Sequence, residues 1–152
     1  MVKELKKTDK ILTKIDMCKS DSGICGKSLR QAHYALGKEL AKSLLVSEKL
    51  ENQKICIFIF MRAGLCFALG IADFLDKHCA VDLYFSYKNE AISDQYDRFI
   101  LVDAVINSGK TILEAIQTLD SNKVIVATNT FASKSIDLFK SINTEKSYNC
   151  RN

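Results

Sequence analysis

The chain has 152 residues and a formal net charge of +4, and its length predicts a single domain spanning residues 1–152. A hydrophobic content of 47% and a charged content of 26% exclude wholesale disorder. No apolar run approaches the ~18 residues of a membrane span, and the basic start MVKELKKTDK lacks the apolar stretch of a secretory signal. The weak, lysine-rich positive charge suits anionic small molecules and does not favour nucleic acid.

The N-terminal part, about residues 1–50, is predicted to be helical. Residues 3–16 place scattered apolar positions among lysines, which predicts a short amphipathic helix. The Gly- and Ser-containing stretch 17–27 is predicted to be a loop. Ser28 is predicted to cap a long helix from Leu29 to about Leu50. The apolar face expected for that helix contains Leu29, Ala32, Leu36, Leu40 and Leu44.

The rest of the chain, about residues 54–145, alternates between strand and helix patterns. Strands are predicted over 54–60, 80–87, 98–104 and 123–131, with a short edge strand from about Lys146. Helices are predicted over 65–78, 110–120 and 133–141, and loops over 61–64, 88–97 and 105–109. This alternation predicts an α/β fold with a mostly parallel sheet flanked by helices. Ligands bind such sheets at the carboxyl ends of the strands, where the loops 61–64 and 104–111 lie.

The stretch ILVDAVINSGKTILEAI combines an apolar strand, an acid (Asp103), a short Ser-Gly-Lys-Thr loop and a helix. Gly109 would let the backbone approach a ligand, and the N–H groups of residues 107–111 would face outward at a helix N-terminus, which is a phosphate cradle. The plainer alternative is a strand-to-helix turn capped by Ser108 with a solvated Lys110. A Walker A loop requires a glycine at position 104, which is Ala104, so a P-loop nucleotide binder is disfavoured.

Residues 100–111 resemble the phosphoribosyl-diphosphate (PRPP) site of type I phosphoribosyltransferases, in which an apolar strand and one or two acids precede a loop closing on Thr/Ser-Gly. The non-acidic Ala104 resembles the uracil phosphoribosyltransferases. FMRAGLCFALGIADFL (60–75) looks like their strand–Leu-Arg-Ala-Gly-Leu–helix segment, and VDLYFSYKNEA (81–91) resembles their next strand. Arg30 lies where the family has an Arg in its early helix. The similarity covers about residues 12–141.

This resemblance implies transfer of the phosphoribosyl group from PRPP to a nucleobase, with release of pyrophosphate and a preference for a uracil-like pyrimidine. Asp103 and Arg62 would be catalytic, with Asp103 on the ribose hydroxyls. The expected PRPP and phosphate contacts are Arg62, Ala63, Gly64, Asp103, Ala104, Asn107, Ser108, Gly109, Lys110 and Thr111. Tyr87 and Lys88 are expected loop contacts, and Asn129 and Thr130 expected base contacts. The family also implies a non-proline cis peptide in the loop 61–64.

Further expectations concern cofactor, partners and location. Mg²⁺ would be held mainly through PRPP, without direct protein ligands. The expected partners are PRPP, a nucleobase or nucleoside monophosphate, and, by resemblance, a second copy of the chain in a homodimer. No nucleic acid or membrane partner is expected, and a cytoplasmic location is predicted.

Two departures from the family keep an alternative open. The loop 88–97 is shorter than the family's closing loop, and the Gly/Pro-rich C-terminal segment that reads uracil is absent from the 152 residues. These departures leave the acceptor base open. The alternative function is a catalytically weak PRPP- or nucleotide-binding regulatory protein.

The cysteines and histidines receive structural interpretations. The six cysteines show no CxxC spacing, which gives a zinc site no support. Cys56, Cys66 and Cys79 lie in apolar surroundings and are expected to be small buried hydrophobes in a reduced chain. His33, within a predicted helix, and His78, at a predicted helix end, are also interpreted as structural.

Overall fold

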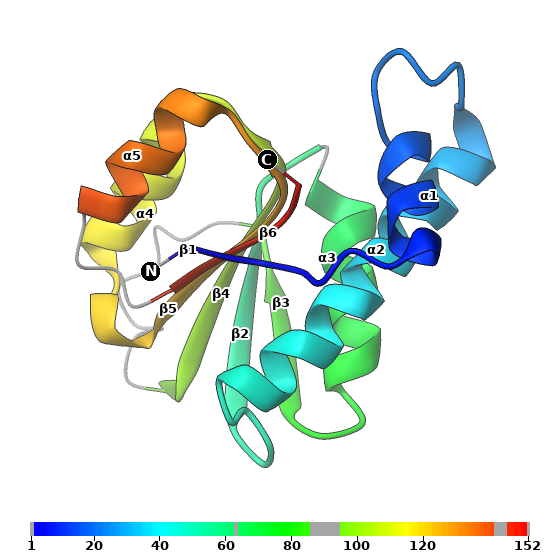
Figure 1. Cartoon of the computed structure of the whole chain (residues 1–152). Helices are drawn as coiled ribbons and strands as arrows, with labels where there is room; N and C mark the ends of the chain where they lie inside the picture. Colours follow the sequence, from blue (N-terminus) through cyan, green and yellow to red (C-terminus); the bar gives the residue numbers. More distant parts are fainter. Residues whose placement is uncertain (1, 63, 86–94, 142–145, 152) are drawn as a thin grey trace.

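A computed structural model describes residues 2–62, 64–85, 95–141 and 146–151, and it has a six-stranded sheet between two layers of helices (Figure 1). The helices α1, α2 and α3 cover one face of the sheet, and α4 and α5 cover the other. The strands are β1 (Val2–Glu4), β2 (Lys54–Ile59), β3 (Ala80–Tyr84), β4 (Arg98–Ile106), β5 (Val124–Phe131) and β6 (Lys146–Arg151). The helices are α1 (Asp9–Met17), α2 (Gly26–Ser47), α3 (Gly64–Leu75), α4 (Lys110–Thr118) and α5 (Ser133–Ser141), with a 3-10 turn at Ser121–Lys123.

All strand pairs are parallel, in the order β1-β6-β5-β4-β2-β3, so the predicted α/β class is confirmed. The central strand β4 is apolar on both faces because both faces are covered. Ile100 and Val102 pack with α2 and α3, whereas Phe99 and Leu101 pack with α4 and α5. The near-continuous apolar run read from the sequence therefore marks the middle of the sheet.

The N-terminal residues depart from the predicted helix 3–16. Residues 2–4 form β1, which pairs with β6, and α1 starts at Asp9, where the Thr8 side chain accepts a hydrogen bond from the Ile11 amide. Consequently β6 lies between β1 and β5 and is not an edge strand. A three-residue strand gains its stability from pairing with the far end of the chain, which local periodicity does not reveal.

The start of α2 also differs from the prediction. The residue before its first turn is Cys25, with no side-chain cap, and Ser28 lies inside the helix. The apolar face is confirmed for Ala32, Leu36, Leu40 and Leu44, which are buried, while Leu29 is partly exposed. Among the helices that the structure describes, none has the length and hydropathy required to cross a membrane.

The cysteine interpretation is confirmed for Cys56, which is buried, and is wrong for Cys66 and Cys79, which are half-buried. Burial raises the pKa of the Cys56 thiol to about 12, which keeps it protonated and unreactive. Cys79 uses its thiol to donate to the Leu50 carbonyl (3.1 Å). Cys66 is partly exposed because it faces a hollow between α2 and α3.

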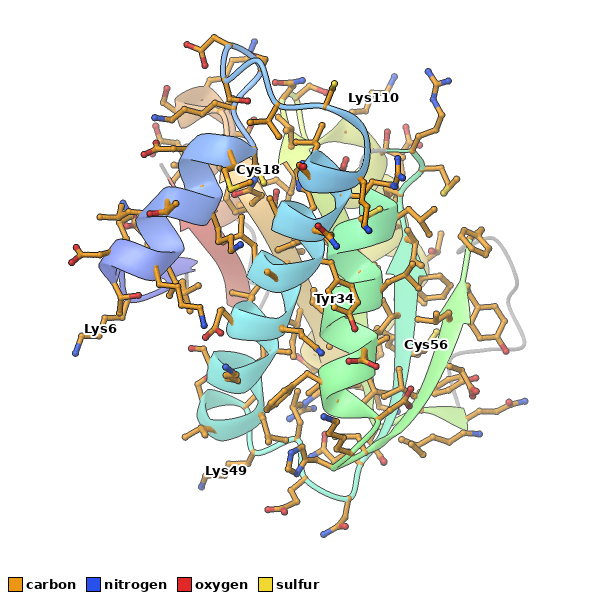
Figure 2. All side chains as sticks on the ribbon, turned by 90° about the vertical axis from the view of Figure 1, so that its right-hand side faces the viewer. Lys6, Cys18, Tyr34, Lys49, Cys56 and Lys110 are labelled. Carbon is orange, nitrogen blue, oxygen red and sulfur yellow. The ribbon has the colours of Figure 1, made fainter. Side chains whose placement is uncertain are left out.

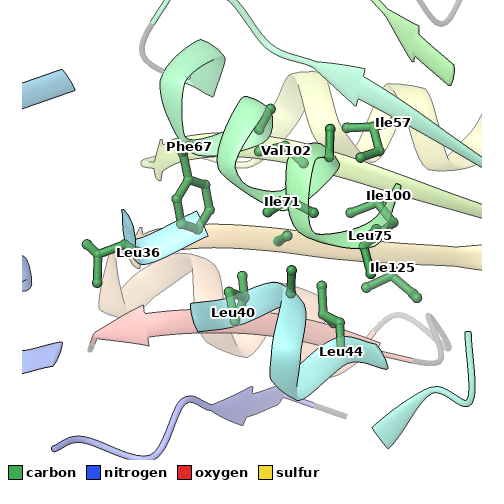
Figure 3. Packing of buried hydrophobic residues seen from close by; sticks show 14 of the residues in the cluster. Leu36, Leu40, Leu44, Ile57, Phe67, Ile71, Leu75, Ile100, Val102 and Ile125 are labelled. Atoms are coloured by element: carbon green, nitrogen blue, oxygen red, sulfur yellow. The ribbon is translucent and has the colours of Figure 1, made fainter. Parts of the chain in front are cut away.

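The helices α2 and α3 pack backbone against backbone, and two glycines make this possible. A Cβ on Gly37 would overlap the carbonyl oxygen of Phe67, and a Cβ on Gly70 would overlap that of Tyr34. Beneath this contact, the core is filled by Leu36, Leu40 and Leu44 of α2 and Phe67, Ile71 and Leu75 of α3 (Figure 3). An ion pair between Lys38 and Asp73 (2.7 Å) joins the two helices on their outer side.

Replacing Gly70 by alanine is expected to lower the free energy of unfolding by about 3 kcal/mol, because backbone atoms of α2 would have to move. Urea unfolding followed by circular dichroism measures this change. Ser28→Ala is the matched control: Ser28 is exposed and caps nothing, so its effect should stay within about 0.5 kcal/mol. Equal, small effects of both substitutions would contradict the close helix contact.

Candidate functional site

The two loops singled out in the sequence meet beside Asp103 at the carboxyl edge of the sheet. The Phe60 amide donates to the Val102 carbonyl (2.9 Å), and the Gly64 amide donates to the Phe60 carbonyl (3.2 Å). A Cβ on Gly64 would lie 2.8 Å from the Val102 carbonyl oxygen and 3.3 Å from the Asp103 Cα. The start of α3 therefore lies directly against the strand segment that carries the acid, and glycine permits that approach.

The predicted strand 98–104 implied that Asp103 lies at the strand's tip. In the structure β4 continues to Ile106, so Asp103 lies within the strand. The strand β2 ends opposite Val102, whereas β4 and β5 stay paired through Asp103–Thr128, Val105–Thr130 and Ile106–Phe131. Asp103 is thus the first residue of β4 beyond the end of β2. Its side chain is half-buried, and this burial raises the pKa of the carboxyl group, while hydrogen bonds from the Val105 and Ala104 backbones act in the opposite direction.

A hollow of about 200 Å³ opens beside Asp103. It is lined by Asp103 and residues 105–112, so Asp103 and the predicted cradle 107–111 face one space. Figure 2 shows Lys110 at the end of the molecule opposite Lys49, which precedes β2, as expected for the carboxyl edge. The first N–H groups of α4 lack partners within the helix, and the helix dipole favours an anion there.

Gly109 is the N-cap residue of α4, with φ +73°, so Ser108 is not the cap that the plainer alternative required. Ser108 Oγ instead accepts from the Lys110 amide at 3.5 Å, a weak interaction. A Cβ on Gly109 would lie 2.7 Å from Cε2 of Phe139 on α5. A glycine is therefore required at position 109 because the backbone is left-handed there and because Phe139 of α5 packs against it. The sequence pattern indicated a different reason, the close approach of a ligand to the backbone.

The loop 61–64 presents Met61 and Arg62 to solvent, with Met61 56% exposed. The peptide bond between Met61 and Arg62 is cis, as the family resemblance implied. Arg62 lies two residues before Gly64, which packs against Val102 and Asp103, so Arg62 is at the same carboxyl edge of the sheet. It does not line the 200 Å³ hollow. Ala63, Tyr87 and Lys88 were also expected at the site and lie outside the described residues.

Like Arg62 and Gly64, three further predicted site residues contribute to the edge without lining the hollow: Ala104, Asn129 and Thr130. Ala104 is buried and its carbonyl accepts from the hydroxyl of Thr128 (3.2 Å). Asn129 is 1% exposed, and neither polar atom of its side chain has a hydrogen-bond partner among the described residues. Thr130 is half-buried, and its amide donates to Thr128 Oγ1 (3.3 Å).

The sequence reasoning missed two hydroxyl residues that hold the loop around Asp103. Thr128 is fully buried and joins β5 to Ala104, and Ser135 of α5 donates from its hydroxyl to the Asn107 carbonyl. The signal for Thr128 was the polar segment 128–130, which it begins directly after the apolar run 124–127. No signal in the sequence singled out Ser135, because its partner is 28 residues away.

Solved structures share this fold at low sequence identity. The AQ2163 protein from Aquifex aeolicus is 16% identical, with a TM-score of 0.73 over 99% of this chain and 86% of that one. Hypoxanthine-guanine phosphoribosyltransferase from Schistosoma mansoni, solved in complex with IMP, is 17% identical, with a TM-score of 0.51 over 81% of this chain and 66% of that one. A purine phosphoribosyltransferase from Pyrococcus horikoshii is 17% identical with a TM-score of 0.48, covering 84% and 86% of the two chains.

The family model for uracil phosphoribosyltransferase matches residues 39–141, which is most of the chain. The protein therefore belongs to the uracil phosphoribosyltransferase family, which supports a function of the phosphoribosyltransferase type. No curated protein sequence matches it significantly. The matched range contains the loop 61–64, Asp103 and the loop 107–111, so the resemblance read from these motifs is confirmed at the level of the family.

Gly109→Ala is expected to destabilise the protein by more than Gly23→Ala does. Both glycines have a left-handed φ, +73° and +71°, so both variants incur a backbone cost of about 1–2 kcal/mol. A Cβ on Gly23 would meet none of the described atoms within 4 Å, whereas one on Gly109 would meet Phe139, which is 1% exposed and packs on Phe131. Chemical unfolding should show an excess of about 1 kcal/mol or more for Gly109→Ala; equal losses would contradict the contact with Phe139.

Asp103→Asn is expected to raise the melting temperature at pH 7. Burial raises the folded-state pKa of Asp103 above the unfolded value of about 3.9, so the ionised carboxylate destabilises the folded state at neutral pH. The advantage of the amide should shrink as the pH falls through the folded pKa, because the acid becomes neutral too. Calorimetry at pH 7 and pH 4 tests the sign, with Asp120→Asn, an exposed acid, as the control. A lower melting temperature at pH 7 would reverse the argument.

Proposed function

We propose that the protein transfers the phosphoribosyl group from PRPP to a nucleobase and releases pyrophosphate, with a uracil-like pyrimidine as the favoured acceptor. The observation that carries this proposal is the placement of Asp103 between Gly64 at the start of α3 and the hollow lined by residues 107–111. An acid flanked by two helix N-termini suits a ligand that has a sugar between two anionic groups. Membership of the family supports the same reaction class.

The reaction breaks the bond between C1 of the ribose and a pyrophosphate oxygen and forms a bond from C1 to a base nitrogen. The ribose acquires positive charge as the bond breaks, as in other glycosyl transfers. Asp103 would face this charge and accept hydrogen bonds from the ribose hydroxyls. Residues 107–111 would hold the 5-phosphate, and Arg62 with the amide of residue 63 would hold the departing pyrophosphate. The Gly64 amide, also expected there, instead donates to the Phe60 carbonyl. Catalysis then consists of positioning and charge stabilisation.

The residues present fit Mg²⁺ that PRPP itself brings to the site. Within the described ranges, no three His, Cys, Asp or Glu side chains gather to hold a metal ion, and the hollow has one carboxylate, Asp103. Mg²⁺ commonly keeps several waters and binds through substrate phosphates with few protein ligands. When bound, it would neutralise charge on the pyrophosphate.

Asn129 is the residue we propose for contact with the base. A buried amide that makes no hydrogen bond to the described residues costs free energy. Asn129 directly follows Thr128, the register partner of Asp103, near the carboxyl end of β5, where a ligand could supply the missing partners. Its side chain offers a donor beside an acceptor, which matches the adjacent N–H and C=O of a pyrimidine edge. Thr130, Tyr87 and Lys88 remain proposed contacts. The homodimer and the cytoplasmic location remain predictions.

Pyrophosphate release from PRPP and Mg²⁺, measured with uracil, cytosine, hypoxanthine and adenine, tests the proposal. The wild-type protein should turn over with at least one base, and Asp103→Asn should be about 10²–10³-fold slower, because it loses an oriented charge facing the ribose. Asp120→Asn should retain the wild-type rate. Tight PRPP binding without turnover with any base would instead favour the alternative of a PRPP-binding regulatory protein, and absence of PRPP binding would contradict both.

Arg62→Ala is expected to weaken the binding of PRPP and of pyrophosphate but to leave the binding of a nucleoside 5-monophosphate almost unchanged. The guanidinium is a planar fork of donors suited to pyrophosphate, which the monophosphate lacks. The expected loss is about 2–4 kcal/mol for PRPP, measured by calorimetry. Arg98→Ala, at the opposite end of β4, is the control. Equal losses for both ligands would assign Arg62 to the 5-phosphate or to the fold.

A further inference from the structure

The loop from Ile106 to Gly109 rests on α5, a helix in which the sequence patterns indicate no site residue. The Ala132 amide, just before α5, donates to the Ile106 carbonyl (2.9 Å). One turn further on, the Ser135 hydroxyl donates to the Asn107 carbonyl. Phe139, four residues after Ser135 and so on the same helix face, lies against Gly109. Successive peptide units of the loop are thus held from one side.

These contacts determine where the amides of the loop point. In a planar trans peptide, the C=O and the following N–H point in opposite directions. Because the Asn107 carbonyl faces Ser135, the N–H of Ser108 faces away from α5. The contact between Ile106 and Ala132 directs the N–H of Asn107 away from α5 in the same way. Asn107 and Ser108 are both exposed and both line the hollow beside Asp103.

We infer that Ser135 is a positioning residue for phosphate binding: its hydroxyl holds the Asn107 peptide so that the Ser108 N–H is presented to the phosphate group of a sugar 5-phosphate. This inference rests on the proposed function, because it takes the hollow to be the 5-phosphate site. Ser135 is 1% exposed and so acts through the loop without touching the ligand. Without the hydroxyl, the Asn107 carbonyl loses its partner and the peptide can rotate toward water.

The experiment uses ribose 5-phosphate, which contains the sugar and the 5-phosphate but no pyrophosphate. It is titrated into the ¹⁵N-labelled full chain, and the amide signals of Ser108 and Thr111 are followed by NMR. Ser135→Ala should bind about tenfold more weakly, the order expected for one lost hydrogen bond. Its Ser108 signal should respond less than in the wild type, whereas the response of Thr111, whose amide belongs to the first turn of α4, should persist.

Ser133→Ala is the matched control, since it removes a hydroxyl from the same helix at an exposed position. It should bind as the wild type does. Thermal unfolding of each variant separates loss of binding from loss of fold, and the change in the Ser108 signal relative to Thr111 is a signature that general destabilisation would not produce. Unchanged affinity and an unchanged Ser108 response in Ser135→Ala would overturn the inference, as would failure of the wild type to bind ribose 5-phosphate.

Turnover of PRPP is measured separately on the same proteins. A wild type that binds ribose 5-phosphate in a Ser135-dependent way but releases no pyrophosphate with any base contradicts the proposed transfer reaction and supports the role of Ser135. A wild type that turns over, with Ser135→Ala indistinguishable in affinity and in the Ser108 signal, supports the transfer reaction and overturns the role of Ser135.

Discussion

The pairing of β4 with β5 beyond the end of β2 positions the rest of the candidate site. Opposite Val102 the sheet loses β2 on one side of β4, so the backbone from Asp103 onward is open to a neighbour there. The start of α3 occupies that space, with Gly64 in contact with the Val102 carbonyl. On the other side, β5 keeps β4 extended as far as Ile106. Asp103 is therefore held in a paired strand, with the start of α3 on one side of it and the hollow lined by residues 107–111 on the other.

Two features of this edge are unfavourable for stability, and both lie close to Asp103 in the sheet. They are the half-buried carboxyl of Asp103 on β4, with its raised pKa, and the buried amide of Asn129 on β5, which has no hydrogen-bond partner in the described part of the chain. Such costs persist when the surrounding structure holds the groups in place. Here the surrounding structure is the doubly covered sheet, which has an apolar core on each face. Concentration of unfavourable groups at one edge is typical of a binding site.

The two helical layers contribute to this edge in different ways. The layer of α1–α3 is fixed by a close helix contact through Gly37 and Gly70, and its α3 carries the loop 61–64. The layer of α4 and α5 carries the loop 107–111. Helix α5 contacts the backbone of this loop, where Ser135 donates to the Asn107 carbonyl and Phe139 packs against Gly109. A ligand that spans the edge would therefore touch both layers. Motion of one layer relative to the other would change the separation of the loops 61–64 and 107–111.

The sequence by itself determined the α/β class, the buried central strand and the two loops at the carboxyl edge. Apolar runs such as 54–60 and 98–104 indicate strands that are buried on both faces. The acid Asp103, with Ser-Gly-Lys-Thr five residues later at 108–111, indicates the end of a strand, a turn and the start of a helix. All of these are local patterns. Helix α5 was also predicted with its observed bounds, because its apolar spacing is complete within nine residues.

Only the tertiary structure decided the features that join distant residues. It placed β1 beside β6, extended β4 past Asp103 through its register with β5, and turned the potential Cβ of Gly109 toward Phe139. It also brought Ser135 to the Asn107 carbonyl. These contacts depend on the relative placement of elements that are tens of residues apart, and no local spacing of residue types encodes that placement. For the same reason, the sequence predicts an anion-binding loop at 107–111, whereas the directions of the Asn107 and Ser108 amides follow from the contacts that Ala132 and Ser135 make with the carbonyls before them.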